Sequence, residues 1–218
     1  MMDIFAVGVA IGWIEKNPVA VTLPITPEVK RKRLTLDRFK AILEEAPKVA
    51  DWLQNAMLLA LVSGQDRSTI GSWERIWVKD GIATVWREKT RRWIAIPTAI
   101  RMDAIGMSLD DVVTRCKSTN MVSKYLIHHV RNVGEAKRGD PIRHKSIMSA
   151  FTKALKLTEM PKENAPTFHE IRSLSKRTYD AEGRVDTNAL LGHSTDATAN
   201  LYADNRGIEP IKVRVTAA

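Results

Sequence analysis

Three short motifs near the end of this 218-residue sequence carry side chains suited to chemistry on an anion: "HEIR" (169–172), "LLGH" (190–193) and "NLY" (200–202). His169 and Arg172 stand three residues apart in a segment that favours a helix, with Thr167 as its expected N-cap. Both side chains would then lie near a helix N-terminus, where free amides and the helix dipole already favour negative charge. The motif indicates a phosphate clamp, although by itself it is also typical of a surface histidine beside a solvated arginine.

Other residues along the chain extend this motif. His193 and Tyr202 come after it in a polar stretch, while Arg67 and Lys89 precede it, the first after an apolar helix and the second in a hairpin. A phosphodiester attacked by a phenol needs donors for its non-bridging oxygens, a group that manages the phenolic proton, and an acid for the leaving 5′-hydroxyl. Two arginines, two histidines, a lysine and a tyrosine supply these groups without a metal.

The remaining histidines and the cysteine content argue against a metal site. His128 and His129 are adjacent in an expected helix and would point in different directions, and no two histidines stand four residues apart. Cys116 is the only cysteine, which excludes an internal disulfide and a cysteine-based metal site. A single cysteine fits a reducing cytoplasm.

The charge of the chain indicates a polyanionic partner. Lysine and arginine number 34 against 25 acidic residues, a formal net charge of +9. Such an excess favours nucleic acid first and an acidic membrane surface second. No apolar run approaches the roughly 18 residues of a membrane span. The apolar opening lacks a basic leading region, so we expect no signal peptide.

The periodicity of the chain predicts a helix-rich domain with one small sheet. A helix capped by Thr35 should run to about Glu45, and a strongly apolar helix should end at Gly64. The stretch "IWVKDGIATVWREKTRRWIAIP" predicts a three-stranded antiparallel meander, with turns at Asp80-Gly81 and around Thr90. Further helices are expected at 4–16, 98–105, 108–117, 120–133, 143–157, 167–181, 186–192 and 195–202, and a strand in "IKVRV".

Taken in order, "HEIR", "LLGH" and "NLY" resemble the active-site signature of the tyrosine recombinases. Within that family the chain resembles lambda-type phage integrases most closely. "RKRLTLDRFKAIL" is similar to the start of their catalytic domain, and "REKTRRWIAIPTAIRMDAIGMSLDDV" to their lysine hairpin and the helix after it. The resemblance covers roughly residues 31–211. Its combined motifs are highly specific, whereas "HxxR" alone would be weak.

The resemblance implies an α+β fold: a mostly helical catalytic domain with a small three-stranded antiparallel sheet and a C-terminal tail strand. The implied organisation is a last helix of a truncated upstream core-binding domain, a linker, the catalytic domain and the tail strand, at 1–20, 21–33, 34–207 and 208–218. The alternating tail should form an edge strand on the small sheet of its own chain or of a neighbour.

The resemblance also implies the role of each candidate residue. Tyr202 would be the nucleophile that forms a 3′-phosphotyrosine. His169 and Arg172 match the HxxR pair, His193 matches the second histidine, and Lys89 matches the lysine that protonates the leaving oxygen. The basic residues expected on the DNA are Arg87, Arg91, Arg92 and Lys176. Tyr179 is a rival nucleophile, but its place inside the HxxR helix favours packing.

The function implied by this resemblance is that of a site-specific recombinase, which cuts and rejoins DNA strands with neither a metal nor a nucleotide cofactor. The implied partners are double-stranded DNA with att-type core sites and, at full length, three further copies of the chain in a tetramer. Host DNA-bending proteins and excision accessory proteins would be additional partners. The implied place of action is the cytoplasm of a bacterial host, on DNA and not at a membrane.

One position departs from the family pattern. The pattern Gly-x-Arg would place the first arginine of the clamp at position 66, but the chain has Asp66 there, and Arg67 comes next. Gly64 could permit a one-residue adjustment that brings Arg67 into the pocket, with Asp66 turned outward or holding a neighbouring basic side chain. The alternative is a catalytically impaired DNA-binding module. A type IB topoisomerase would share the chemistry, but the lambda-like segments argue against it.

Overall fold

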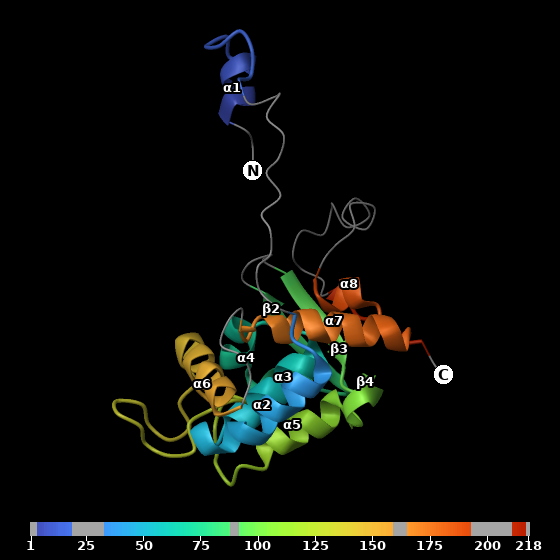
Figure 1. Ribbon diagram of the computed structural model, residues 1–218. Coiled ribbons are helices and arrows are strands. Elements are labelled where there is room, and N and C mark those ends of the chain that lie inside the picture. Colours follow the sequence, from blue (N-terminus) through green and yellow to red (C-terminus); the bar gives the residue numbers. More distant parts are fainter. Residues whose placement is uncertain (1–3, 19–32, 88–91, 159–164, 193–210, 217–218) are drawn as a thin grey trace. The chain divides into compact units, whose positions relative to one another are not determined.

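The computed structural model describes residues 4–18, 33–87, 92–158, 165–192 and 211–216. The chain divides into two compact units, residues 1–30 and residues 31–218 (Figure 1). In the first unit, helix α1 spans Ile4–Ala10, so it is shorter than the helix expected over 4–16. The chain turns away soon afterwards, at Gly12, which has a left-handed backbone (φ 76°).

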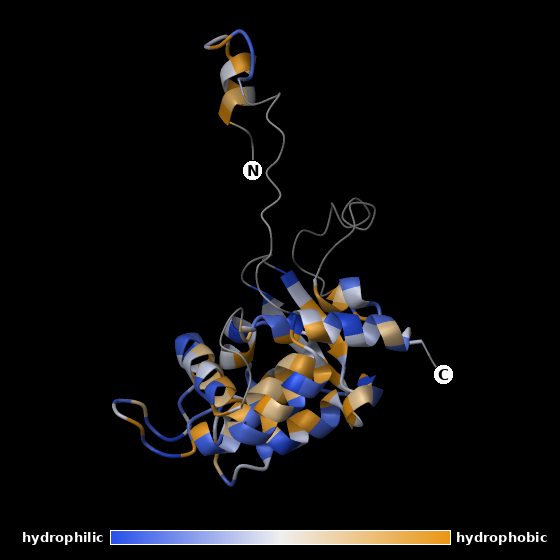
Figure 2. Ribbon diagram, in the orientation of Figure 1, coloured by the Kyte–Doolittle hydropathy of each residue, from blue (hydrophilic) through white to orange (hydrophobic). Residues whose placement is uncertain are grey.

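The second unit is built around helix α3 (Leu53–Ser63), in which every side chain except that of Gln54 is buried. A helix that is apolar on all sides needs neighbours on all sides. Figure 2 shows its hydrophobic colouring against the more polar helices around it. Among the helices that pack against it are α2 (Leu36–Val49), α5 (Leu109–Lys117), α6 (His144–Leu157) and α7 (Glu170–Glu182).

Local signals correctly predicted where several of these helices begin and end. Thr35 caps α2, its side chain accepting a hydrogen bond from the Arg38 amide at 3.4 Å. The helix continues past the expected end at Glu45 and includes Pro47 in its last turn. Gly64 ends α3 in a left-handed conformation (φ 65°), as expected for a glycine at that position.

The expected antiparallel meander is confirmed. Strands β1 (Val78–Lys79), β2 (Ile82–Arg87) and β3 (Arg92–Pro97) pair in sequence order, just after the 3₁₀ turn η1 (Arg75–Trp77). Asp80 and Gly81 both have positive φ (51° and 75°), the conformation of a tight two-residue hairpin turn.

The tail strand is also confirmed. Strand β6 (Ile211–Lys212) pairs in parallel with β3 of its own chain, Ile94 lying opposite Ile211. Val213 is buried and Ile211 half-buried, while Lys212 and Arg214 are exposed, as the alternating pattern predicts. Val215, which was expected on the same buried face, is exposed, so the pattern holds only over 211–214.

Two expected helices are absent from the described residues. The segment 98–105 forms strand β4 (Arg101–Met102) and the 3₁₀ turn η2 (Asp103–Ile105), and β4 pairs with β5 (Met107–Ser108). The segment 120–133 is irregular, with bends and isolated β-bridges, because its backbone bonds to other parts of the chain: the Leu126 amide donates to the Trp73 carbonyl and the His129 amide to the Asp140 carbonyl, both at 2.9 Å. His128 and His129 therefore do not lie on a helix.

Candidate active site

Helix α7 places Arg172 in the interior, near the helix's own beginning. The helix starts at Glu170 with His169 as its N-cap, so the expected cap at Thr167 is wrong. Arg172 is 8% exposed. Its Nη1 donates to the Gly64 carbonyl at 2.6 Å and its Nη2 to the Leu191 carbonyl at 2.5 Å. The HxxR arginine thus joins the end of α3 to the "LLGH" motif.

Burial and, to a smaller extent, the positive charge of Arg87 lower the pKa of Arg172 to about 10, while Asp66 opposes the shift. This value still lies well above neutral pH, so the guanidinium is charged under ordinary conditions. A cation whose orientation is fixed by carbonyl groups is a preorganised donor for an anion.

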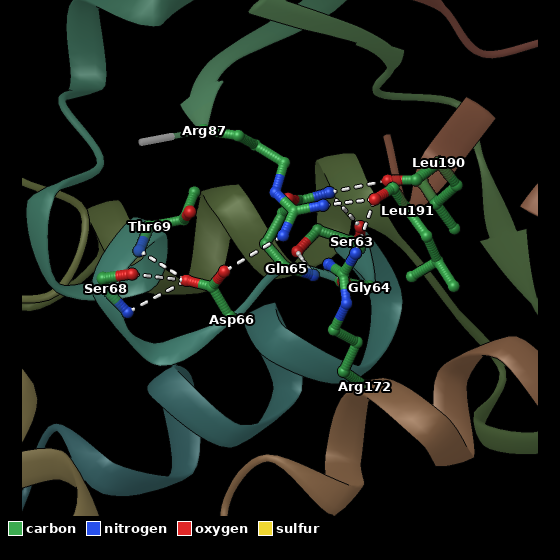
Figure 3. Close-up of polar contacts among 10 residues, drawn as sticks. All are labelled: Ser63, Gly64, Gln65, Asp66, Ser68, Thr69, Arg87, Arg172, Leu190 and Leu191. Atoms are coloured by element: carbon green, nitrogen blue, oxygen red, sulfur yellow. Dashed lines mark hydrogen bonds and ion pairs between the residues drawn. The ribbon is translucent and has the colours of Figure 1, made fainter. Parts of the chain in front are cut away.

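Arg87 provides a second buried guanidinium at the same carbonyl (Figure 3). It ends β2 on the buried face that also carries Ala83 and Val85, and it is 5% exposed. Its Nη1 donates to the Leu191 carbonyl, and its Nη2 lies 3.3 Å from Oδ2 of Asp66. Its Nε is buried and has no hydrogen-bond partner among the described residues. Arg87 therefore does not lie on an outer surface of the hairpin, where we expected it to follow the DNA backbone.

Asp66 uses its two carboxylate oxygens for two different purposes. Oδ1 caps helix α4 (Arg67–Ser72), accepting from the amides of Ser68 and Thr69, each at 3.1 Å. Oδ2 faces Arg87 (Figure 3). Burial raises the pKa of Asp66, but the hydrogen bonds of Ser68 and Thr69 and the charges of Arg87 and Arg172 bring it down to about 2. The carboxylate is ionised at neutral pH.

The outward orientation expected for Asp66 is therefore wrong, and the other expected arrangement, in which it holds a neighbouring basic side chain, is found. That side chain is Arg87. Arg67 starts α4 and is half-buried, and its side chain makes no hydrogen bond or ion pair with any described residue. The catalytic role expected for Arg67 stays a prediction with no contact in its favour.

Gly192 explains why the "LLGH" motif needs a glycine. Helix α8 (Thr187–Leu190) leads into Leu191, and Gly192 then turns the chain with φ 63°. A β-carbon at this position would lie 2.9 Å from Cδ1 of Ile94 and 3.2 Å from Nη1 of Arg87. Any larger residue would therefore press on Arg87. His193 comes directly after Gly192.

The structure places three of the other predicted site residues. His169 is exposed at the start of α7, and Arg92 is half-buried opposite Arg87 in the sheet. Lys176 binds within the protein, its ammonium donating to Asp180 at 2.7 Å and to Thr187 at 3.1 Å. Four predicted residues lie outside the described ranges: Lys89, Arg91, His193 and Tyr202.

Tyr179 is confirmed as a packing residue. It is fully buried, and its hydroxyl donates to the Val62 carbonyl at 2.8 Å. Burial raises the pKa of this phenol far above its ordinary value. A buried phenol that holds its proton tightly is unsuited to attack DNA.

The contact between Asp66 and Arg87 was not predicted from the sequence. The signal was present in β2: Arg87 continues the inward series of Ala83 and Val85, and a cation on the buried face of a strand requires a partner. Within the described ranges, no group of three or more histidine, cysteine or carboxylate side chains could hold a metal ion. No described helix has the length and apolar character of a membrane span.

The fold and this cluster of arginines define an α+β domain with a polar, cationic interior site. The chain belongs to the phage integrase family, whose pattern it matches over residues 32–207.

Three comparisons illustrate the similarity. The chain is 40% identical over 193 residues to prophage integrase IntE of Escherichia coli (strain K12), covering 88% of this chain and 51% of that protein. It is 34% identical over 217 residues to the integrase of Escherichia phage lambda, covering 99% of this chain and 59% of that one. A crystal structure of a lambda integrase (75–356) dimer bound to a COC′ core site matches with a TM-score of 0.72 and 33% identity, covering 89% of this chain and 69% of that chain. The chain thus spans little more than half the length of these two integrases.

Proposed function

We propose that this chain is the catalytic part of a site-specific DNA recombinase of the tyrosine class. The observation that carries the proposal is the pair of buried guanidinium groups that meet at the Leu191 carbonyl, two residues before His193. Two fixed cations at one point suit the non-bridging oxygens of a phosphodiester. Family membership and the order of the motifs supply the rest of the chemistry.

The proposed reaction exchanges one phosphoester for another. The Tyr202 hydroxyl attacks phosphorus and loses its proton, with His169 and His193 as the groups available to accept it. The bond from phosphorus to the 5′ oxygen breaks, and that oxygen takes a proton from Lys89. The result is a 3′-phosphotyrosine and a free 5′-hydroxyl. Attack by a 5′-hydroxyl from another strand reverses these steps and joins the strands, so the energy of the bond is conserved.

The proposed partners are those of the solved relatives. Lambda integrase has been solved as a dimer on a core site and as a tetramer on a Holliday junction. We expect the full-length form of this chain to act likewise on att-type sites in the host cytoplasm, with DNA-bending and excision proteins as accessory partners. Assignment of residues 1–20 to an upstream core-binding domain and of 21–33 to a linker is part of this proposal.

Covalent trapping tests the proposed function. The chain is incubated with a pool of nicked duplexes whose core sequence is randomised, and the products are separated on a denaturing gel. Release of the short strand beyond the nick prevents rejoining, so we expect a protein–DNA adduct, and sequencing of its DNA should reveal a preferred site. Specific binding without any adduct would instead favour an impaired DNA-binding module, and adducts without sequence preference would favour a topoisomerase.

The role proposed for Lys89 has a separate chemical test. Replacing Lys89 with alanine should slow cleavage of ordinary DNA, because the leaving oxygen then lacks its proton donor. A duplex with sulfur at the bridging 5′ position should largely restore the rate, since a thiolate leaves without a proton. Single-turnover cleavage rates on both substrates measure this effect. Equal losses on the two duplexes would mean that Lys89 positions the DNA and does not donate the proton.

A further inference from the structure

Position 66 presents a chemical problem for the proposed reaction. A family-like clamp needs a second arginine there, and the chain has a carboxylate with a pKa of about 2. A carboxylate facing a phosphate would repel it. The adjacent Arg67 makes no polar contact with the described part of the site. Either the site lacks its second donor, or another residue supplies it.

We propose that Arg87, held by Asp66, is the second phosphate-binding arginine of this chain. The proposal rests on the proposed function, since it assigns a donor for that same reaction. Arg87 reaches the site from β2, a different element from α4, which the family pattern would use. Asp66 is then a positioning residue: it caps α4 with one oxygen and directs the Arg87 guanidinium with the other (Figure 3).

The position of Arg87 fits this role because its guanidinium shares one acceptor with that of Arg172, the carbonyl oxygen of Leu191. Both side chains donate to the Leu191 carbonyl, so the two guanidinium groups lie next to each other. Their exposed fractions are similarly small, 5% for Arg87 and 8% for Arg172. Arg87 is therefore about as buried as Arg172, the HxxR arginine to which the family motif already assigns phosphate binding.

The charges and hydrogen bonds of the cluster leave a place for an anion. Two guanidinium groups face one carboxylate, which leaves one positive charge uncompensated by the described neighbours. Nε of Arg87 is buried and has no partner among the described residues. A buried donor of this kind is costly unless an acceptor meets it. A phosphate oxygen would supply both the acceptor and the opposite charge.

Two features of the sequence support this placement. Arg87 stands two residues before Lys89, so one hairpin would deliver a phosphate donor and the proposed acid. Gly192 provides the space, because a β-carbon there would lie 3.2 Å from Nη1 of Arg87. Arg87 is therefore accommodated by the same glycine that precedes His193.

The test moves the guanidinium from position 87 to position 66. Cleavage of a suicide duplex is compared for the parent chain, Arg87→Gln, and the double variant Asp66→Arg with Arg87→Gln, with DNA binding measured alongside. We expect Arg87→Gln to lower the cleavage rate by about a hundredfold or more, as the loss of one fixed donor does, with affinity changed far less. The double variant should recover most of the rate, because it places an arginine at position 66. Arg131→Ala, which removes an exposed arginine paired with Asp51, is the matched control and should cleave like the parent.

The variant Asp66→Asn provides a second test, because the inference and its alternative predict opposite changes in the cleavage rate. Asparagine retains a side-chain oxygen that can cap α4, so the fold should be kept, and thermal unfolding checks this. If Asp66 positions Arg87, removing its charge should slow cleavage. If Asp66 only opposes the phosphate, the same change should accelerate cleavage, which would overturn the inference.

Other outcomes also separate the inference from the function it rests on. Near-parental cleavage by Arg87→Gln would overturn the assignment, and so would a double variant as slow as Arg87→Gln alone. A silent parent with an active double variant would show that the Asp66–Arg87 pair blocks the site, which would overturn the inference and favour an impaired DNA-binding module. The absence of an adduct from all variants would remove the proposed function, and the inference with it.

Discussion

A chain carrying Tyr202→Phe is expected to form no covalent complex with DNA while binding it with nearly unchanged affinity. The substitution removes only the oxygen proposed to attack phosphorus, and no neighbouring group can form the same ester. Denaturing gels of suicide-duplex reactions should show the adduct of the parent fall below detection. Gel-shift or anisotropy titrations of the same duplex should give similar binding curves.

Tyr179→Phe is the control for this experiment. Its hydroxyl donates to the Val62 carbonyl in the core, so its loss should cost on the order of 1 kcal/mol of stability. The adduct should nevertheless form at close to the parental rate. An inactive Tyr179→Phe chain that folds, together with an active Tyr202→Phe chain, would refute the assignment of the nucleophile.

Arg172→Lys should have the second-largest effect, a loss of about a hundredfold to a thousandfold in cleavage rate. Lysine keeps the positive charge but is a single-point donor, so it cannot bridge the carbonyls of Gly64 and Leu191 as the guanidinium does. The loss should appear in the single-turnover rate at saturating DNA. Affinity should fall much less, because charge contacts elsewhere on the basic chain remain.

The matched control, Arg184→Ala, removes an exposed arginine that pairs with Asp103 at 3.0 Å, away from the site. It should leave the cleavage rate within a few-fold of the parent. Thermal unfolding distinguishes loss of the clamp from loss of the fold, since Arg172→Lys also leaves a buried carbonyl without its donor. A folded Arg172→Lys chain that cleaves like the parent would show that the bridging geometry is unimportant.

The sequence alone determined the elements whose signals are local. Thr35 begins α2 and Gly64 ends α3, because a cap hydrogen bond and a left-handed glycine depend on a few neighbouring residues. Asp80 and Gly81 set the hairpin between β1 and β2 in the same way. The alternation of the tail likewise predicted strand β6 and the burial of Val213, although Val215 is exposed. The order of the motifs "HEIR", "LLGH" and "NLY" in the chain also indicated the phage integrase family.

The tertiary structure alone decided what depends on distant partners. The segment 120–133 has apolar residues that would suit a helix, yet it is irregular, because the carbonyl of Trp73 and that of Asp140 bind its amides. No local pattern contains those partners.

The same reason applies to the site. Asp66 and Arg87 stand on different elements, and Leu191 lies far along the chain from both, so their contact is created only when β2 packs beside α4 and β3 packs beside α8. From the sequence, we expected Asp66 to leave the phosphate clamp without its first arginine, and we expected Arg87 to contact the DNA from the protein surface. Folding places the carboxylate and the guanidinium together in the interior, where each needs the other because a buried charge is costly without a partner.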